Sequence, residues 1–223
     1  MSQIDNWKRV DSAGTVLHWY DFICPFCYVG QQRNAILIRH GLNVDELAFQ
    51  AHPDIPPRGI PAGLRQGSMY AMLEREAKEA GLALNWPPRL PDSRRALAAA
   101  EWVRQQQPDH FAQFQKDLFA AHFVLGEDLG NPAVIDRHAS DRGIDVKALH
   151  VALADGSALT AVRQSESLGR QYGVHGTPAW FLAKRLISGL LPASDFERLA
   201  EAAEQLERRC GSLCENIPSQ QVS

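Results

Sequence analysis

The chain has 223 residues, of which 45% are hydrophobic and 22% charged, so it can bury a full hydrophobic core without disulfide staples. Its formal net charge of −3 provides no basic surface for nucleic acid or anionic lipid, which excludes both as expected partners. It also has no run of about 18 apolar residues, so no membrane span is expected.

The four cysteines are the first candidates for chemistry. The opening residues, MSQIDNWKRVDSAGT, lack the apolar segment of a secretory signal, which predicts a cytoplasmic protein. Cysteines in a reducing compartment are not expected to form a permanent disulfide framework. A cysteine pair there is more often catalytic, redox-active or metal-binding.

The first part of the chain predicts a βαβ unit. Residues 15–23, TVLHWYDFI, combine β-branched, aromatic and aliphatic side chains and predict a strand buried on at least one face. Cys24 and Cys27 follow at once, and a helix is expected from about Cys24 to Gly41. Residues 46–53, ELAFQAHP, predict a second strand. The cysteine pair then lies at a strand-to-helix turn, on the helix N-terminus.

The next hundred residues change in character. Amphipathic periodicity and helix end signals predict an all-helical block with helices at 68–80, 92–107, 109–123, 132–142 and 145–154. A helix, two short strands and a final helix are expected after it, from ALTAVRQSESLGRQYG, AWFLAKRLIS and residues from 194 to about Gly211. This is the element order of a thioredoxin fold interrupted in its middle.

These elements predict an α/β protein of three parts. Residues 15–60 and 156–209 are expected to form a thioredoxin-like domain, and residues 61–155 a helical insertion domain. Residues 210–223 are expected to form a C-terminal tail.

The spacing of Cys24 and Cys27 fits either half of a zinc site or a redox pair. A structural zinc site needs four ligands, and none of the eight histidines forms a second ligand pair, so no metal is expected. A helix N-terminus stabilises a thiolate at Cys24, and one helical turn keeps Cys27 within reach of it. Pro25 suits the first turn, where its missing N–H would have had no partner. Cys24 is therefore predicted to attack and Cys27 to resolve the mixed disulfide.

A set of motifs spread over residues 15–207 resembles the DsbA-type branch of the thioredoxin-fold oxidoreductases. These motifs are CPFC, the YVG after it, HP after the second strand, SRRA at 93–96, GEDLGNP at 126–132 and GVHGTPAWFL at 173–182. Within that branch, the chain is most similar to the cytoplasmic FrnE-like proteins, grouped with 2-hydroxychromene-2-carboxylate isomerases.

The resemblance implies a DsbA-like fold and thiol–disulfide exchange without a bound cofactor, on a protein or a low-molecular-weight thiol or disulfide. It implies that Pro178 follows a cis peptide bond and faces the cysteine pair, which would leave the Thr177 backbone to pair with a substrate segment. Pro25, Phe26 and His175 are also expected beside the substrate.

Position 26 departs from the periplasmic members of the branch, which carry histidine between the proline and the second cysteine. Phe26 offers no cationic partner, so the Cys24 pKa is expected to be less depressed and the couple less oxidising, at about −200 to −270 mV. His175 would partly replace the missing histidine if its loop lies near Cys24, and is otherwise an exposed loop residue.

Two other functions stay open at this point. One is a glutathione-dependent isomerase or transferase on a small aromatic substrate, although relatives of that type usually carry serine at the position of Cys24. In such an enzyme, six aromatic residues would line an apolar pocket; in the alternative, they pack the core. These residues are Trp19, Tyr20, Phe22, Phe26, Tyr28 and Trp180. The other is a chaperone or binding module that does not need the cysteines.

A second cysteine pair lies near the end of the chain. Cys210 and Cys214 follow the last predicted helix and a polar tail follows them. They are either an auxiliary redox pair that relays electrons to the first pair or incidental thiols.

Overall fold

The computed structural model describes residues 14–214, with side chains described as far as Gln205. A four-stranded sheet is formed by β1 (Thr15–Tyr20), β2 (Asn43–Ala48), β5 (Ala179–Leu182) and β6 (Arg185–Ser188). Its order is β2-β1-β5-β6, with β1 and β2 parallel and the other neighbours antiparallel. The predicted thioredoxin-like fold with a helical insertion is confirmed.

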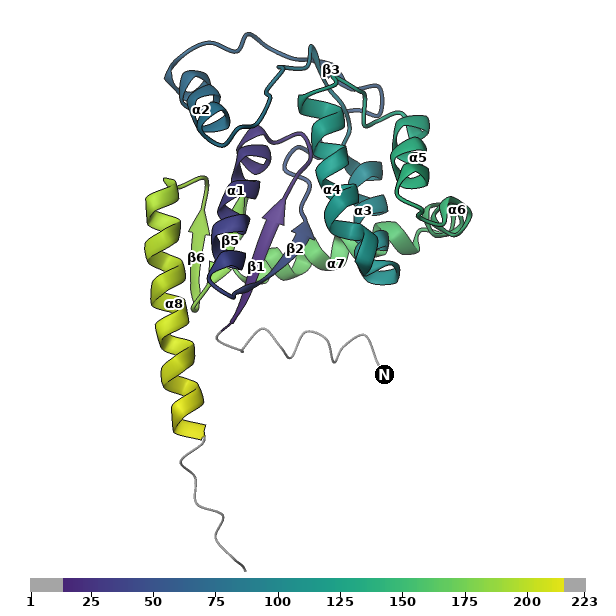
Figure 1. Ribbon diagram of the computed structural model, residues 1–223. Coiled ribbons are helices and arrows are strands. Elements are labelled where there is room, and N and C mark those ends of the chain that lie inside the picture. The colour runs from purple at the N-terminus through teal and green to yellow at the C-terminus, as the bar shows by residue number, and fades with distance from the viewer. Residues whose placement is uncertain (1–13, 215–223) are drawn as a thin grey trace, which may run out of the picture.

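Helices cover both faces of this sheet (Figure 1). Helices α1 (Pro25–Arg39) and α8 (Ala193–Cys214) pack on one face, where Val16 of β1 meets Phe196 of α8 in a buried cluster. Helix α7 (Ser157–Gln171) packs on the other face, where Leu17 belongs to a separate cluster. The alternation of Val16 and Leu17 between the two clusters follows from the two-residue period of a strand.

Five helices lie in the chain between β2 and α7. They are α2 (Ser68–Glu79), α3 (Arg94–Gln106), α4 (Pro108–Phe123), α5 (Pro132–Asp141) and α6 (Val146–Ala154). Buried residues of α3 and α4 form one hydrophobic cluster with Tyr20, Phe22 and Cys24 at the end of β1. The inserted helices therefore share a core with the part of the sheet that carries the cysteine pair.

Three details of the sequence-based assignment are wrong. Strand β2 runs from Asn43 to Ala48, not from residue 46 to 53, because it is an edge strand whose first half is polar and largely exposed. A short antiparallel pair, β3 (Ile60–Pro61) with β4 (Arg89–Leu90), was not expected. Helix α8 continues past Gly211 to Cys214, since one helical glycine disfavours a helix by only about 1 kcal/mol.

None of the described helices is long and apolar enough to span a lipid bilayer.

Candidate active site

Cys24 is the N-cap residue of α1. Its backbone is extended, with φ −86° and ψ 113°, and Pro25 occupies the first helical turn. The backbone N–H groups of Cys27 and Tyr28 donate to the Cys24 carbonyl oxygen at 3.0 and 3.1 Å, so the turn closes directly behind the first cysteine. Cys24 retains 8% exposure and Cys27 none. Cys24 is therefore the more accessible residue of the pair.

Thr177 lies beside this turn although it is far away in the sequence. The Cys24 thiol donates a hydrogen bond to the Thr177 carbonyl oxygen, with an Sγ–O distance of 3.4 Å. The Thr177–Pro178 peptide bond is cis, and the Pro178 carbonyl oxygen accepts a hydrogen bond from the Gly189 N–H. The structure thus brings together four predicted site residues, Cys24, Cys27, Thr177 and Pro25.

The two cysteines have pKa shifts in opposite directions. Burial by itself raises the pKa of Cys24, but hydrogen bonds from the Cys27 thiol and backbone, together with Thr177, bring it below its ordinary value. Burial raises the pKa of Cys27 well above its ordinary value, and the hydrogen bond to Cys24 raises it further. The shared proton therefore resides on Cys27 when Cys24 is a thiolate.

Asp21 is a buried carboxyl three residues before Cys24. Its oxygens accept hydrogen bonds from the backbone N–H groups of Ile23 and Ala51, at 3.3 and 2.8 Å. Burial raises the pKa of Asp21, and its negative charge in turn raises the pKa of Cys24. Asp21 was not predicted as a site residue, although a lone carboxyl within the apolar segment 15–23 is a signal for a buried acid.

A pocket of about 350 Å³ opens onto Cys24. Its walls come from the start of α1, the chain after β2 and the segment between residues 63 and 90. They are formed by Ile23, Cys24, Pro25, Phe26, Ala51, His52, Gly63, Arg65, Met69, Tyr70, Trp86, Leu90, Phe123 and Thr177. Pro25, Phe26 and Thr177 were predicted there, whereas His52, Arg65 and Trp86 were not.

The other predicted residues lie elsewhere. His175 is exposed, and no hydrogen bond or ion pair joins it to Cys24 among the described residues. Of the six aromatic residues considered for an apolar pocket, only Phe26 lines it. The other five are buried in the core, with Trp180 stacked on His18 at a centroid distance of 4.5 Å. The side chains of Cys210 and Cys214 lie outside the described residues.

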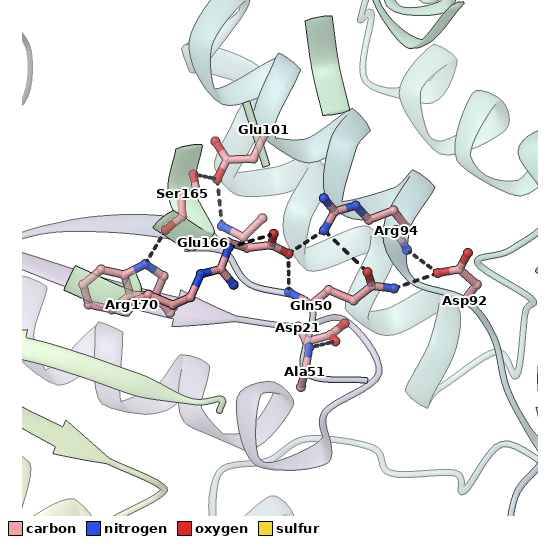
Figure 2. A network of polar contacts seen from close by, with 11 residues as sticks. Asp21, Gln50, Ala51, Asp92, Arg94, Glu101, Ser165, Glu166 and Arg170 are labelled. Atoms are coloured by element: carbon pink, nitrogen blue, oxygen red, sulfur yellow. Dashed lines mark hydrogen bonds and ion pairs between the residues drawn. The ribbon is translucent and has the colours of Figure 1, made fainter. Parts of the chain in front are cut away.

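A polar network joins the end of β2 and the chain after it to α3 and α7 (Figure 2). The buried Glu101 carboxylate accepts hydrogen bonds from the Ala48 N–H at 2.7 Å and from the Ser165 hydroxyl at 2.8 Å. Glu166 accepts a hydrogen bond from the Gln50 N–H and forms an ion pair with Arg94. Helices α3 and α7 therefore fix the backbone that leads to His52.

No three His, Cys, Asp or Glu side chains within the described part of the chain gather as metal ligands. The site consists of a dithiol at a helix N-terminus, a buried carboxyl and a pocket with mainly apolar walls.

A thioredoxin fold with a dithiol at the first helix and a cis-proline loop opposite it defines a class of thiol–disulfide proteins. Residues 15–204 match the DSBA-like thioredoxin domain, so the chain belongs to that family, which includes oxidoreductases.

Several solved structures share this fold. A probable DsbA oxidoreductase from Streptomyces coelicolor is 20% identical, with a TM-score of 0.74 over 94% of each chain. A 2-hydroxychromene-2-carboxylate isomerase is 20% identical, with a TM-score of 0.70 over 89% of this chain and 98% of its own. The cytosolic disulfide reductase DsbM from Pseudomonas aeruginosa, determined with GSH, is 18% identical, with a TM-score of 0.59 over 88% of this chain and 99% of its own.

Proposed function

We propose that the protein is a thiol–disulfide oxidoreductase in which Cys24 attacks and Cys27 resolves. The supporting observation is that the two cysteines differ in accessibility and in the direction of their pKa shifts. Cys24 borders the pocket and has a lowered pKa, whereas Cys27 is fully buried and has a raised pKa. Exchange needs an accessible thiolate and a second thiol held within reach of the mixed disulfide, and the pair has both properties.

The reaction proceeds in two displacements. The Cys24 thiolate attacks one sulfur of a substrate disulfide, forms a mixed disulfide and releases the other half as a thiolate. Cys27 then loses its proton and displaces the second half, which leaves a Cys24–Cys27 disulfide. Starting from the Cys24 thiolate and the Cys27 thiol, the protein gives up two electrons and one proton, and the substrate leaves as one thiolate and one thiol. The reverse sequence oxidises a dithiol substrate.

The experiment is a redox titration in glutathione buffers, with acid quenching, alkylation and mass-spectrometric readout. A Cys210→Ser, Cys214→Ser background ensures that any intramolecular disulfide comes from Cys24 and Cys27. We expect a reversible disulfide with a midpoint of about −200 to −270 mV, because Phe26 offers no cation to the Cys24 thiolate. Cys24→Ser should abolish it, and Cys27→Ser should trap glutathione on Cys24. A midpoint near −120 mV, the value typical of a strong oxidant, would contradict the predicted poise.

A glutathione-dependent isomerase or transferase is the second candidate. It is supported by the pocket beside Cys24, whose walls include Phe26, Tyr70 and Trp86. The titration separates the two functions. If glutathione binds or forms a stable adduct at Cys24 while no intramolecular disulfide appears, this second function replaces the first. The chain would then act on a small aromatic compound, with glutathione as co-substrate.

A cytoplasmic location stays a prediction and fits a reducing role for the pair. DsbM, which shares the fold, is described as a cytosolic disulfide reductase. Rapid alkylation of intact cells should trap the Cys24–Cys27 pair mainly as dithiol, whereas a pair in an oxidising compartment would be recovered as disulfide.

A further inference from the structure

The pocket beside Cys24 contains a marked imbalance of charge. Of its fourteen lining residues, none is aspartate or glutamate, and Arg65 is the one side chain with a permanent positive charge. The Cys24 thiolate, which lines the same pocket, supplies the reacting negative charge. A positive group in a largely apolar wall attracts an anionic part of whatever molecule enters.

Arg65 is held in place by aromatic stacking. Its guanidinium carbon lies 4.9 Å from the centroid of the Trp86 ring. The Trp86 indole N–H donates to a Glu74 carboxylate oxygen at 2.8 Å, and Tyr70 contacts the same ring edge-on at 5.4 Å. Trp86, against which the guanidinium lies, is therefore itself held from two sides.

One nitrogen of this guanidinium lacks an acceptor. Arg65 Nη1 is buried and has no hydrogen-bond partner among the described residues. A buried charged donor without an acceptor is unfavourable, so such groups are normally paired. The acceptor that suits a guanidinium is a carboxylate, which can accept two parallel hydrogen bonds from it.

We infer that Arg65 binds a carboxylate of the substrate, so that the pocket takes low-molecular-weight disulfides with an anionic arm. The inference rests on the proposed exchange chemistry at Cys24. The disulfide sulfur faces Cys24 while the carboxylate of the same half lies against Arg65. Cys24 then forms the mixed disulfide with that half, the other half leaves as a thiolate, and Cys27 releases the bound half.

Three disulfides with the same two-carbon arm test this selectivity. Dithiodipropionate carries carboxylates, hydroxyethyl disulfide is neutral and cystamine carries ammonium groups. The measurement is the second-order rate constant for oxidation of the Cys24–Cys27 dithiol, in the Cys210→Ser, Cys214→Ser background. We expect the order carboxylate, hydroxyl, ammonium. In Arg65→Gln, the ratio of the carboxylate rate to the hydroxyl rate should fall about tenfold or more.

Arg75→Gln is the matched control, because Arg75 is exposed on α2 and outside the pocket lining but changes the net charge equally. Its rate ratio should stay within about twofold of the parent ratio, as expected for a screened surface charge. The neutral disulfide also reports folding, since a misfolded Arg65 variant would lose that rate as well. Arg65→Lys should keep part of the preference.

The outcomes separate the two proposals. If none of the three disulfides oxidises the pair, the exchange function itself fails. If the neutral disulfide reacts but the ratio of the carboxylate rate to the hydroxyl rate is equal in Arg65→Gln, Arg75→Gln and the parent protein, Arg65 does not bind the carboxylate. A carboxylate-to-hydroxyl rate ratio in the parent protein that is no larger than the ratio for a free thiol such as glutathione would likewise overturn the inference.

Discussion

Residue 26 lies in the first turn of α1, between the two cysteines, and lines the pocket with a half-buried phenyl ring. A histidine at this position would place a cation beside the Cys24 thiolate. An opposite charge at that range lowers a pKa by about one unit or more. Phe26→His should therefore lower the Cys24 pKa and raise the reduction potential, by about 30 mV for each tenfold shift in the exchange equilibrium. Thiolate absorbance against pH and the glutathione titration measure the two effects.

Phe26→Leu provides the control for this substitution. It keeps an apolar side chain against the two hydrophobic clusters that Phe26 contacts, and it adds no charge. The Cys24 pKa in Phe26→Leu should remain close to that of the parent protein. If leucine and histidine lower it equally, then loss of the ring, and not a new cation, controls the thiolate.

The site residues that could be predicted from the sequence belong to short local motifs. Cys24, Pro25 and Cys27 follow from a strand-to-helix turn, because a helix N-terminus imposes the same geometry wherever it occurs. Arg65 and Trp86 could not be found in this way, since neither lies in a helix or strand and their meeting depends on tertiary packing. The same limit explains His52, which tertiary structure brings to the pocket, whereas the expected His175 is exposed and outside the pocket lining.

The buried Glu101 connects helix α3 to strand β2 through a hydrogen bond. Its carboxylate accepts the Ala48 N–H, the Ser165 hydroxyl and the Arg104 guanidinium, the last at 2.7 and 2.9 Å. Glu101→Gln removes the charge and leaves the largely buried Arg104 without its ion pair. We expect a loss of about 2–4 kcal/mol in the free energy of unfolding, measured by urea denaturation.

An exposed ion pair supplies the comparison for Glu101. Glu127 forms ion pairs with Arg137 and His138 near the surface, at 2.6 and 2.8 Å. Glu127→Gln should lower the free energy of unfolding by less than about 1 kcal/mol, because solvent screens such pairs. Equal losses of unfolding free energy in Glu101→Gln and Glu127→Gln would show that the buried Glu101 carboxylate stabilises the fold no more than a carboxylate near the surface does.

Among the secondary-structure elements, helices are easier to predict from this sequence than strands. Helix α4 was expected over 109–123 and runs over Pro108–Phe123, because its apolar stripe repeats with the helical period. The strand pair β3–β4 has two residues in each strand, one of them Pro61, so it presents no alternation to recognise. Its pairing depends on residues 28 positions or more apart, which local patterns do not report.

The buried His122 makes the stability of the whole fold depend on pH. His122 on α4 is 1% exposed, and both ring nitrogens are buried without hydrogen-bond partners among the described side chains. Burial lowers the His122 pKa to about 4, and the nearby charge of Arg65 acts in the same direction. The unfolded chain, with a histidine pKa of about 6.5, therefore takes up this proton before the folded protein does.

The sign of the resulting pH dependence follows from which state binds more protons. Between about pH 6.5 and 4 the unfolded state binds the extra proton, so His122 lowers the free energy of unfolding as the pH falls. The full shift corresponds to about 3 kcal/mol. His122→Phe keeps a ring of similar size against Phe123 but cannot titrate. Urea unfolding at pH 7 and pH 4 should show a smaller loss in the variant than in the parent protein. Parallel losses would mean that His122 does not titrate differently in the folded and unfolded states, and that groups such as Glu127 govern the acid limb, since despite burial the hydrogen bonds from His138 and Arg137 hold the pKa of Glu127 below its ordinary value in the folded protein.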